Sequence, residues 1–170
     1  FFEAWPSNYD PNGDMTKARA YGINDAGDIT GTDLSSFGAG IAFIAMSPAD
    51  HLDDLGGDES YGLAINNRGQ IAGWSEDSSG QRCPCVWDSA GNPSDLLDVG
   101  DPNGSAHAIN NLGVSAGVAV NEPAVFWSDG TVQKLGNFSG GSNGCAYGIN
   151  DNNQVVGWSE TASGDVQAFV

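Results

Sequence analysis

The stretch that decides the fold is AYGINDAGDITG at residues 20–31. It recurs as GLAINNRGQIAG at 62–73, as AHAINNLGVSAG at 106–117 and as AYGINDNNQVVG at 146–157. The Asn of the Ile-Asn pair stands at 24, 66, 110 and 150, so successive copies are 42, 44 and 40 residues apart. A period of about 40–45 residues is typical of propeller blades or helical arrays. The Gly, Asn and β-branched content and the missing 3.6-residue period exclude helices, so the repeat predicts β structure.

Each copy predicts a hairpin. Ile-Asn closes one short strand, and a four-residue turn leads into the next. The last turn position holds Gly27, Gly69, Gly113 and then Asn153, residue types that accept a left-handed backbone at least cost. We therefore expect positive φ there, in a type I turn followed by a bulge. The leading Asn or Asp is expected to bond the backbone two residues ahead, which gives it a structural role in the turn.

Two further strands follow the hairpin in each unit. Third strands are expected at 42–46, 85–87, 124–127 and 166–170, and short fourth strands at 51–56, 95–100 and 131–136. Four short strands in about 42 residues make one propeller blade. The sequence therefore predicts an all-β chain forming a β-propeller of about four four-stranded blades.

The predicted propeller is one repeat domain over residues 1–170. Its repeat units are about 20–60, 61–105, 106–145 and 146–170. The last unit stops after its third strand, and an N-terminal closing segment, 1–19, is expected to complete the last blade and remove an open sheet edge.

The chain also shows a family resemblance. The stretch LGNFSGGSNGCAYGIN at 135–150, followed by QAF at 167–169, resembles the HAF-repeat family of predicted bacterial extracellular proteins. Residues 135–169 carry the resemblance best, and weaker copies cover nearly all of the chain. The His of the family's His-Ala-Phe is absent, because the matching triplets here are IAF at 41–43 and QAF. The resemblance implies secretion or a cell-surface location and repeated β structure, but no activity.

The charge balance limits the partners. The 170 residues hold 22 Asp and Glu against five Lys and Arg, a net charge of −17 with a pI near 4.1. Such a field repels phosphate backbones and anionic lipid. No stretch is long and apolar enough to span a bilayer. We therefore expect no nucleic-acid partner and no membrane insertion.

Chemistry-bearing motifs are sparse. His51 and His107 occupy different repeat positions and lack metal-ligand spacing, and the chain has no Gly-x-Ser-x-Gly nucleophile motif. Paired carboxylates serve glycosidases, but nothing selects a pair among the 22. The sequence therefore predicts a protein that is not an enzyme and requires no cofactor, with a glycoside-processing enzyme as a minor alternative.

Calcium is the one ion that the sequence favours. The loops DPNGD at 10–14 and DPNGS at 101–105 place side-chain oxygens at alternate positions, which suits Ca²⁺. The same sequences are strong turn signals without any metal. The candidate ligands are Asp10, Asn12, Asp14, Asp101, Asn103 and Ser105.

Two covalent features remain open. Cys83 and Cys85 flank a Pro in one strand, so their side chains share a face and a bond between them would be strained. One of the two can pair with Cys145, which leaves an odd thiol. The triplets beginning at Asn103 and Asn137 are glycosylation sequons in predicted loops.

The termini suggest a function. Both ends read as apolar third strands, with Phe1, Phe2 and Trp5 at one end and Phe169 and Val170 at the other. A four-bladed ring needs only one of them, and a spare strand templates addition to another chain. We therefore expect a secreted scaffolding module that assembles with itself as a filament or surface layer. The other interpretation is that the chain is a piece of a longer repeat array, whose boundary leaves the extra strand.

A second function competes with assembly. Trp74 and Trp158 share one repeat position, after the Gly of the second strand. Repeated aromatics of this kind cover neighbouring blades, and they also stack on the apolar faces of sugars in propeller lectins. A glycan-binding propeller lectin with pockets at these residues is therefore the alternative function.

Overall fold

The computed structural model of the chain is all-β. It describes residues 18–34, 39–45, 50–96, 103–119, 122–128, 131–136, 138 and 140–170. All the regular structure in these ranges is β-strand, labelled β1 to β15. Within them, no helix has the length and apolar character needed to cross a membrane.

The strands form four antiparallel sheets, each made of strands in chain order. The first sheet contains β1 (Ala18–Ile23), β2 (Ile29–Asp33), β3 (Ile41–Ala45) and β4 (Asp50–His51). The second contains β5 (Gly56–Ile65), β6 (Ile71–Asp77), β7 (Arg82–Trp87) and β8 (Pro93–Asp95). The third contains β9 (Ser105–Ile109), β10 (Ser115–Ala119), β11 (Glu122–Ser128) and β12 (Thr131–Lys134). The fourth contains only β13 (Gly140–Ile149), β14 (Val155–Thr161) and β15 (Val166–Phe169).

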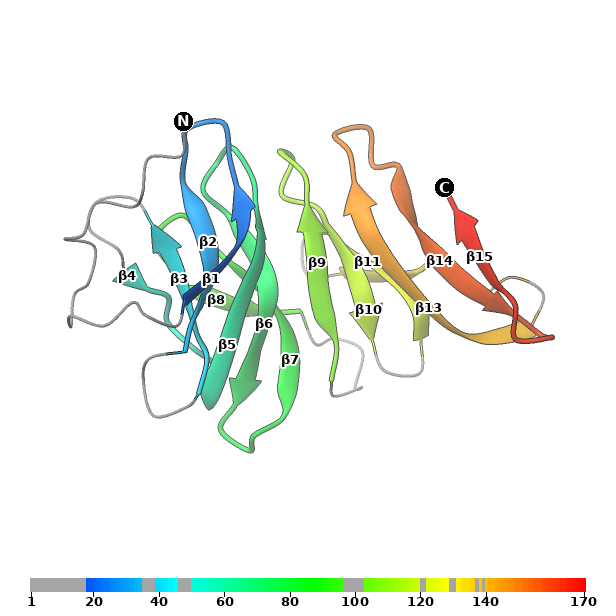
Figure 1. Cartoon of the computed structure of the whole chain (residues 1–170), viewed down its shortest axis with the longest axis horizontal. Coiled ribbons are helices and arrows are strands. Elements are labelled where there is room, and N and C mark those ends of the chain that lie inside the picture. The colour runs from blue at the N-terminus through cyan, green and yellow to red at the C-terminus, as the bar shows by residue number, and fades with distance from the viewer. Residues whose placement is uncertain are drawn as a thin grey trace.

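The sheets stand side by side in one row (Figure 1). The first sheet lies at the left end of the row and the fourth at the right end. The first two residues of β1, Ala18 and Arg19, pair with β2, although they were expected to belong to the closing segment. The rest of that segment, residues 1–17, lies outside the described residues.

The fourth strands are shorter than the sequence predicted. β4 ends at His51 and β8 at Asp95, whereas strands had been expected over 51–56 and 95–100. Gly56 has a φ of 101° and is the first residue of β5. A residue with this backbone conformation turns the chain, so the end of the predicted strand belongs to the next sheet.

The predicted hairpin turns are confirmed. Gly27, Gly69 and Gly113 have φ of 88°, 74° and 86°, and Asn153 has a φ of 59°. In each turn the backbone N–H of this residue donates to the carbonyl of the leading Asn, at 3.0–3.1 Å. Local turn chemistry therefore determines the loop at one end of every sheet.

Each first strand contains a bulge at the same repeat position. The pairing register shifts between Gly62 and Ala64 in β5, and equivalent shifts occur in β1, β9 and β13. Opposite the bulge, a Cβ placed on Gly73 would lie 1.8 Å from the carbonyl oxygen of Tyr61. The recurring Gly of the second strand is thus required by close approach of two backbones.

Neighbouring sheets bury small apolar clusters between them. Ala42 and Leu52 of the first sheet pack against Ile71, Cys85 and Trp87 of the second. The second and third sheets meet at Ala72, Leu96, Ala106 and Ala119. The third and fourth meet at Ala116, Ala146 and Val155, with Ile149 and Phe169 beside them.

Replacing Gly73 with Ala tests the close approach. The new Cβ would force β5 and β6 apart at the bulge, so we expect a loss of about 2–3 kcal/mol in the free energy of unfolding. Gly80→Ala is the control for steric room, because nothing lies within 4 Å of the Gly80 Cβ position and only its positive φ of 76° opposes an Ala there. The control should lose only about 1 kcal/mol. Urea denaturation of both variants measures the difference, and equal losses would contradict the steric argument.

Candidate functional site

The hairpin loops of the four sheets form the most regular polar feature of the molecule. In the second sheet, the Oδ1 of Asn66 accepts from the backbone N–H groups of Arg68 at 2.9 Å and Gln70 at 3.0 Å. The leading Asn of the other loops makes the same pair of bonds. The predicted bond to the residue two ahead is therefore confirmed.

The same Asn side chains also connect the sheets. The Nδ2 of Asn24 donates to the carbonyl of Asn66 at 3.1 Å. Asn66 donates to the carbonyl of Asn110 at 2.9 Å, and Asn110 to that of Asn150 at 2.9 Å. Asn24, Asn66 and Asn110 thus each hold their own turn with the side-chain oxygen and the next loop with the side-chain nitrogen.

A second row of bonds runs beside the first. The backbone N–H of Asp25 donates to the Oδ1 of Asn67, that of Asn67 to Asn111 and that of Asn111 to Asp151, at 2.8–2.9 Å. These backbone bonds point from one sheet to the next along the chain, and the Nδ2 of Asn67 donates in the opposite direction to the Oδ2 of Asp25 at 2.6 Å. We call the two rows the loop ladder; its members are Asn24, Asp25, Asn66, Asn67, Asn110, Asn111, Asn150 and Asp151.

The two ends of the loop ladder differ from its middle. The Nδ2 of Asn150 bonds Gln154 of its own turn at 2.8 Å, and no described residue beyond that turn accepts from it. The backbone N–H of Asp151 and the Oδ1 of Asp25 likewise have no hydrogen-bond partner among the described residues. The end at the fourth sheet therefore offers donors, and the end at the first sheet offers an acceptor.

The Asp151 carboxylate is held in its charged form. The side chain of Asn111 donates to its Oδ2 at 3.0 Å and the backbone N–H of Asn111 to its Oδ1. These two bonds lower the pKa of Asp151, because they stabilise the carboxylate over the neutral acid. Asp151 therefore accepts from the third sheet at neutral pH.

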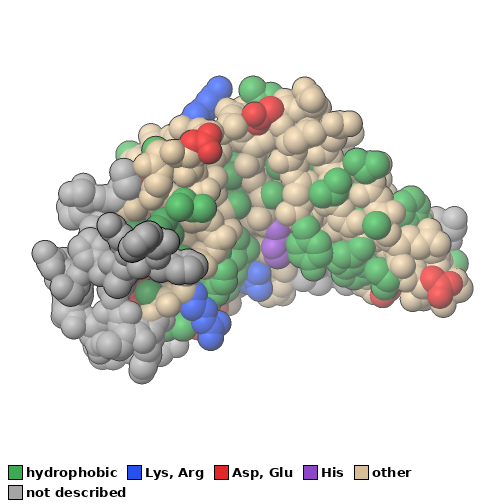
Figure 2. Space-filling view, turned by 45° about the horizontal axis from the view of Figure 1, so that its top comes forward, with side chains coloured by type: hydrophobic (Ala, Val, Ile, Leu, Met, Phe, Trp, Pro, Cys, Tyr) green, Lys and Arg blue, Asp and Glu red, His purple; other side chains and the backbone are tan. Residues whose placement is uncertain are grey.

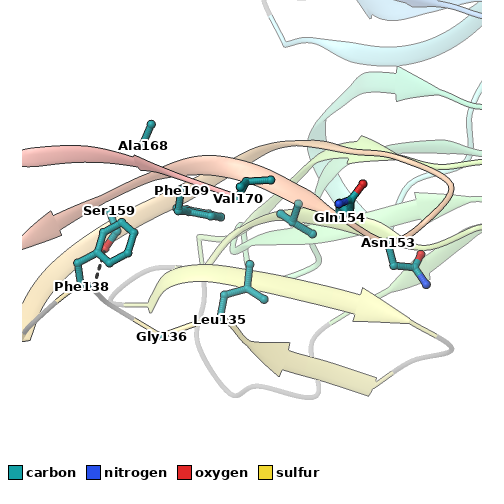
Figure 3. Close-up of a pocket in the computed structure, with 10 residues that line it drawn as sticks. Leu135, Gly136, Phe138, Asn153, Gln154, Ser159, Ala168, Phe169 and Val170 are labelled. Carbon is teal, nitrogen blue, oxygen red and sulfur yellow. Dashed lines mark hydrogen bonds between the residues drawn. The ribbon is translucent and has the colours of Figure 1, made fainter.

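A cavity of about 710 Å³ opens between the third and fourth sheets. Leu135, Phe138, Val155 and Phe169 provide its apolar wall (Figure 3). Trp87 faces Ile71 across β6 and β7 and is completely buried. Val155 is the position equivalent to Ile71, but β15 pairs with β14 only as far as Gly157. The cavity therefore lies at the position that the Trp87 side chain fills in the contact between the first and second sheets.

A second cavity, of about 600 Å³, lies beside Trp158. His107 and Tyr147 line it, with their rings edge to face at 5.4 Å. Arg82 also lines it, and its Nε is buried with no hydrogen-bond acceptor among the described residues. Burial lowers the pKa of His107, so the imidazole is neutral at pH 7, and its Nε2 lies 2.9 Å from the Oγ of Ser105.

The two Trp residues of the predicted sugar pockets are in different surroundings. Trp74 is only 8% exposed. Tyr61 stacks on it at 4.5 Å and the guanidinium of Arg82 covers the ring at 4.2 Å. Trp158 is partly exposed and lines the second cavity. Only Trp158 is therefore placed to meet a ligand.

The three cysteines are free and buried, so the predicted bridge from Cys83 or Cys85 to Cys145 is wrong. Cys83 and Cys85 belong to the second sheet and Cys145 to the fourth, with the third sheet between them. Burial raises the pKa of the Cys83 thiol to about 11 and raises those of Cys85 and Cys145. All three are therefore protonated and poorly nucleophilic at neutral pH.

The calcium and glycosylation candidates fall mostly outside the described residues, where Asp10, Asn12, Asp14, Asp101 and Asn137 lie. Asn103 is exposed before β9, with a φ of 77°. Ser105 is buried against His107. Among described residues there is no group of three or more His, Cys, Asp or Glu that could hold a metal ion.

The candidate assembly strands are described at one end only. Phe169 is the last residue of β15 and contacts Phe138 edge to face at 6.4 Å. Val170 follows it and is 88% exposed. Phe1, Phe2 and Trp5 lie outside the described residues.

The sequence reasoning missed the loop ladder. Its signal was the repetition of Asn at the leading turn position together with Asn or Asp at the next one, in all four copies. A turn needs only the first of these side chains, so the second one pointed to a partner outside the turn.

Comparison with family models, curated proteins and solved structures found no match to this chain.

Replacing Asn66 with Asp tests the loop ladder. Asp keeps the oxygen that holds the turn but loses the amide that donates to Asn110, in a buried position. We expect a loss of about 2 kcal/mol in the free energy of unfolding. Asn150→Asp is the matched control, because Asn150 holds an identical turn and has no further loop to bond among the described residues. Urea denaturation at low protein concentration should show a clearly smaller loss for the control, and equal losses would show that the inter-sheet bond adds nothing.

Proposed function

We propose that this chain is a non-catalytic structural repeat module that associates with copies of itself in extracellular scaffolding. In this proposal its four sheets are blades of the propeller type. Two observations support the blade assignment: each sheet is an antiparallel meander in chain order, and neighbouring sheets pack through repeated positions. The acidic composition and the resemblance to extracellular repeats support the location.

The edge of β15 is the observation that carries the proposal. In the first three sheets a fourth strand pairs with the third strand, as β8 does with β7. In the fourth sheet, no described strand pairs with the outer edge of β15. Val166 of this strand is 63% exposed. An apolar strand with an unpaired edge favours addition of a strand from another chain.

The proposed donor is the apolar segment of residues 1–5 of a second copy, which the sequence predicts to be a strand. Donor and acceptor differ, so the contact is head-to-tail and repeats along a filament instead of closing. The charge of −17 opposes the approach of two copies. Association should therefore strengthen with salt, or with Ca²⁺ bound at the acidic loops.

Removing residues 1–5 tests this function. We expect the full chain to form larger species as its concentration and the salt concentration rise, and the truncated chain to shift toward the monomer. A chain with Phe1, Phe2 and Trp5 all replaced by Ser is the matched control for length, and it should behave like the truncation. Light scattering measures the mass distribution. Unchanged distributions in both variants would exclude strand addition at the N-terminus.

Glycan binding is the second candidate, supported by the cavity beside Trp158. An aromatic ring and the neutral His107 are groups that stack on a sugar and bond its hydroxyls, and Arg82 lines the same cavity. A bound glycan should quench Trp fluorescence in the wild type and in Trp74→Phe but not in Trp158→Phe. A glycan array without any hit would exclude this function.

A further inference from the structure

The outer face of the fourth sheet exposes a residue that the other sheets bury. The second residue of each second strand is Thr30, Ala72, Ala116 or Val156. Thr30, Ala72 and Ala116 are completely buried, and the two Ala lie in clusters shared with the next sheet. Val156 is 47% exposed. The fourth sheet therefore presents an interface residue with no described sheet on it, and Figure 2 shows hydrophobic side chains at the surface of this end of the row.

The first sheet shows the complementary feature. The last residue of each first strand is Ile23, Ile65, Ile109 or Ile149. Ile65, Ile109 and Ile149 pack against the clusters that join their sheet to the preceding one. Ile23 is 68% exposed. Ile23 occupies the same repeat position as these contact residues, but no described sheet precedes the first sheet and packs against it.

The backbone and Asn groups at the two ends also match, whereas the side chains of Asp151 and Asp25 are both carboxylates and lack the amide that bonds Asp25 to Asn67 and Asp151 to Asn111. In every described interface, an Asn Nδ2 and a backbone N–H of one sheet bond a carbonyl and an Oδ1 of the next. The fourth sheet ends with the Nδ2 of Asn150 and the N–H of Asp151. The first sheet begins with the carbonyl of Asn24 and the Oδ1 of Asp25. The unused donors of one end are thus the partners that the acceptors of the other end require.

We propose that the loop ladder continues between molecules, with the fourth sheet of one copy docked on the first sheet of a second copy. Val156 would then pack against Ile23 of the next copy. Asn150 and Asp151 would donate to its Asn24 and Asp25. This inference rests on the proposed self-association and specifies its second contact, on the sheet face beside the edge of β15.

A second copy is the occupant because the contact repeats an interface that the chain already forms three times. The first and fourth sheets lie at opposite ends of the row (Figure 1), so the described residues do not bring these surfaces together within one molecule. The contact differs on its two sides, and it therefore propagates instead of closing a pair.

End-blocked copies test the contact. Ile23→Ser and Val156→Ser each alter one exposed residue, so the monomer should keep its stability. We expect each variant alone to associate at least tenfold more weakly than the wild type. A mixture of the two should recover wild-type affinity but stop at the 1:1 dimer, because the Ile23→Ser copy keeps an intact fourth sheet and the Val156→Ser copy an intact first sheet. Analytical ultracentrifugation measures masses and affinities.

A second pair of variants tests the hydrogen bonds. Asn150→Asp removes the free donor and should weaken association, whereas Asn152→Asp adds the same charge in the same turn and should not.

Three results would overturn the inference. If both Ser variants associate like the wild type, the face contact is wrong and strand addition at β15 remains. A loss of stability without a change in mass would mean that the two ends meet within one molecule. A wild type that stays monomeric at every concentration would overturn both this inference and the proposed function.

Discussion

The side-chain amide of the leading Asn is the interaction on which the rest of the structure depends. One end of the group closes a hairpin turn, and the other end fixes the loop of the next sheet. In the first three sheets, this amide therefore couples the local fold of one unit to the position of its neighbour. The repeat length can vary between 40 and 44 residues because the extra residues lie outside these loops.

The local structure could be predicted because it depends on residues close in sequence. Gly27 and Asn153 have positive φ for the same reason, since both residue types tolerate the left-handed conformation. The lengths of the fourth strands could not be predicted in this way. The end of a fourth strand depends on where the chain turns toward the next sheet, as it does at Gly56. The alternation of residue types in the sequence continues past that turn and therefore does not mark it.

The sites depend on neighbours that a repeat pattern does not identify. Trp74 and Trp158 have the same repeat position, yet only Trp74 is covered, by Tyr61 and Arg82. In the fourth sheet, Cys145 faces Trp158 where Tyr61 faces Trp74. Likewise the sequence suggested a bridge from Cys83 or Cys85 to Cys145, but the intervening third sheet separates the thiols. Equivalent positions therefore predict equivalent backbones more safely than equivalent surroundings.

The interfaces also become less well filled along the chain. Trp87 fills the contact between the first two sheets, whereas the last contact joins Ala116, Ala146 and Val155 beside a cavity. In arrays where each unit touches only its neighbours, stability is approximately a sum of unit and interface terms. The fourth sheet is thus the first to fray, and its amide protons should exchange with solvent sooner than those of β6 and β7. The end of the row with the first two sheets is therefore the more stable one, and the less stable end includes the edge of β15.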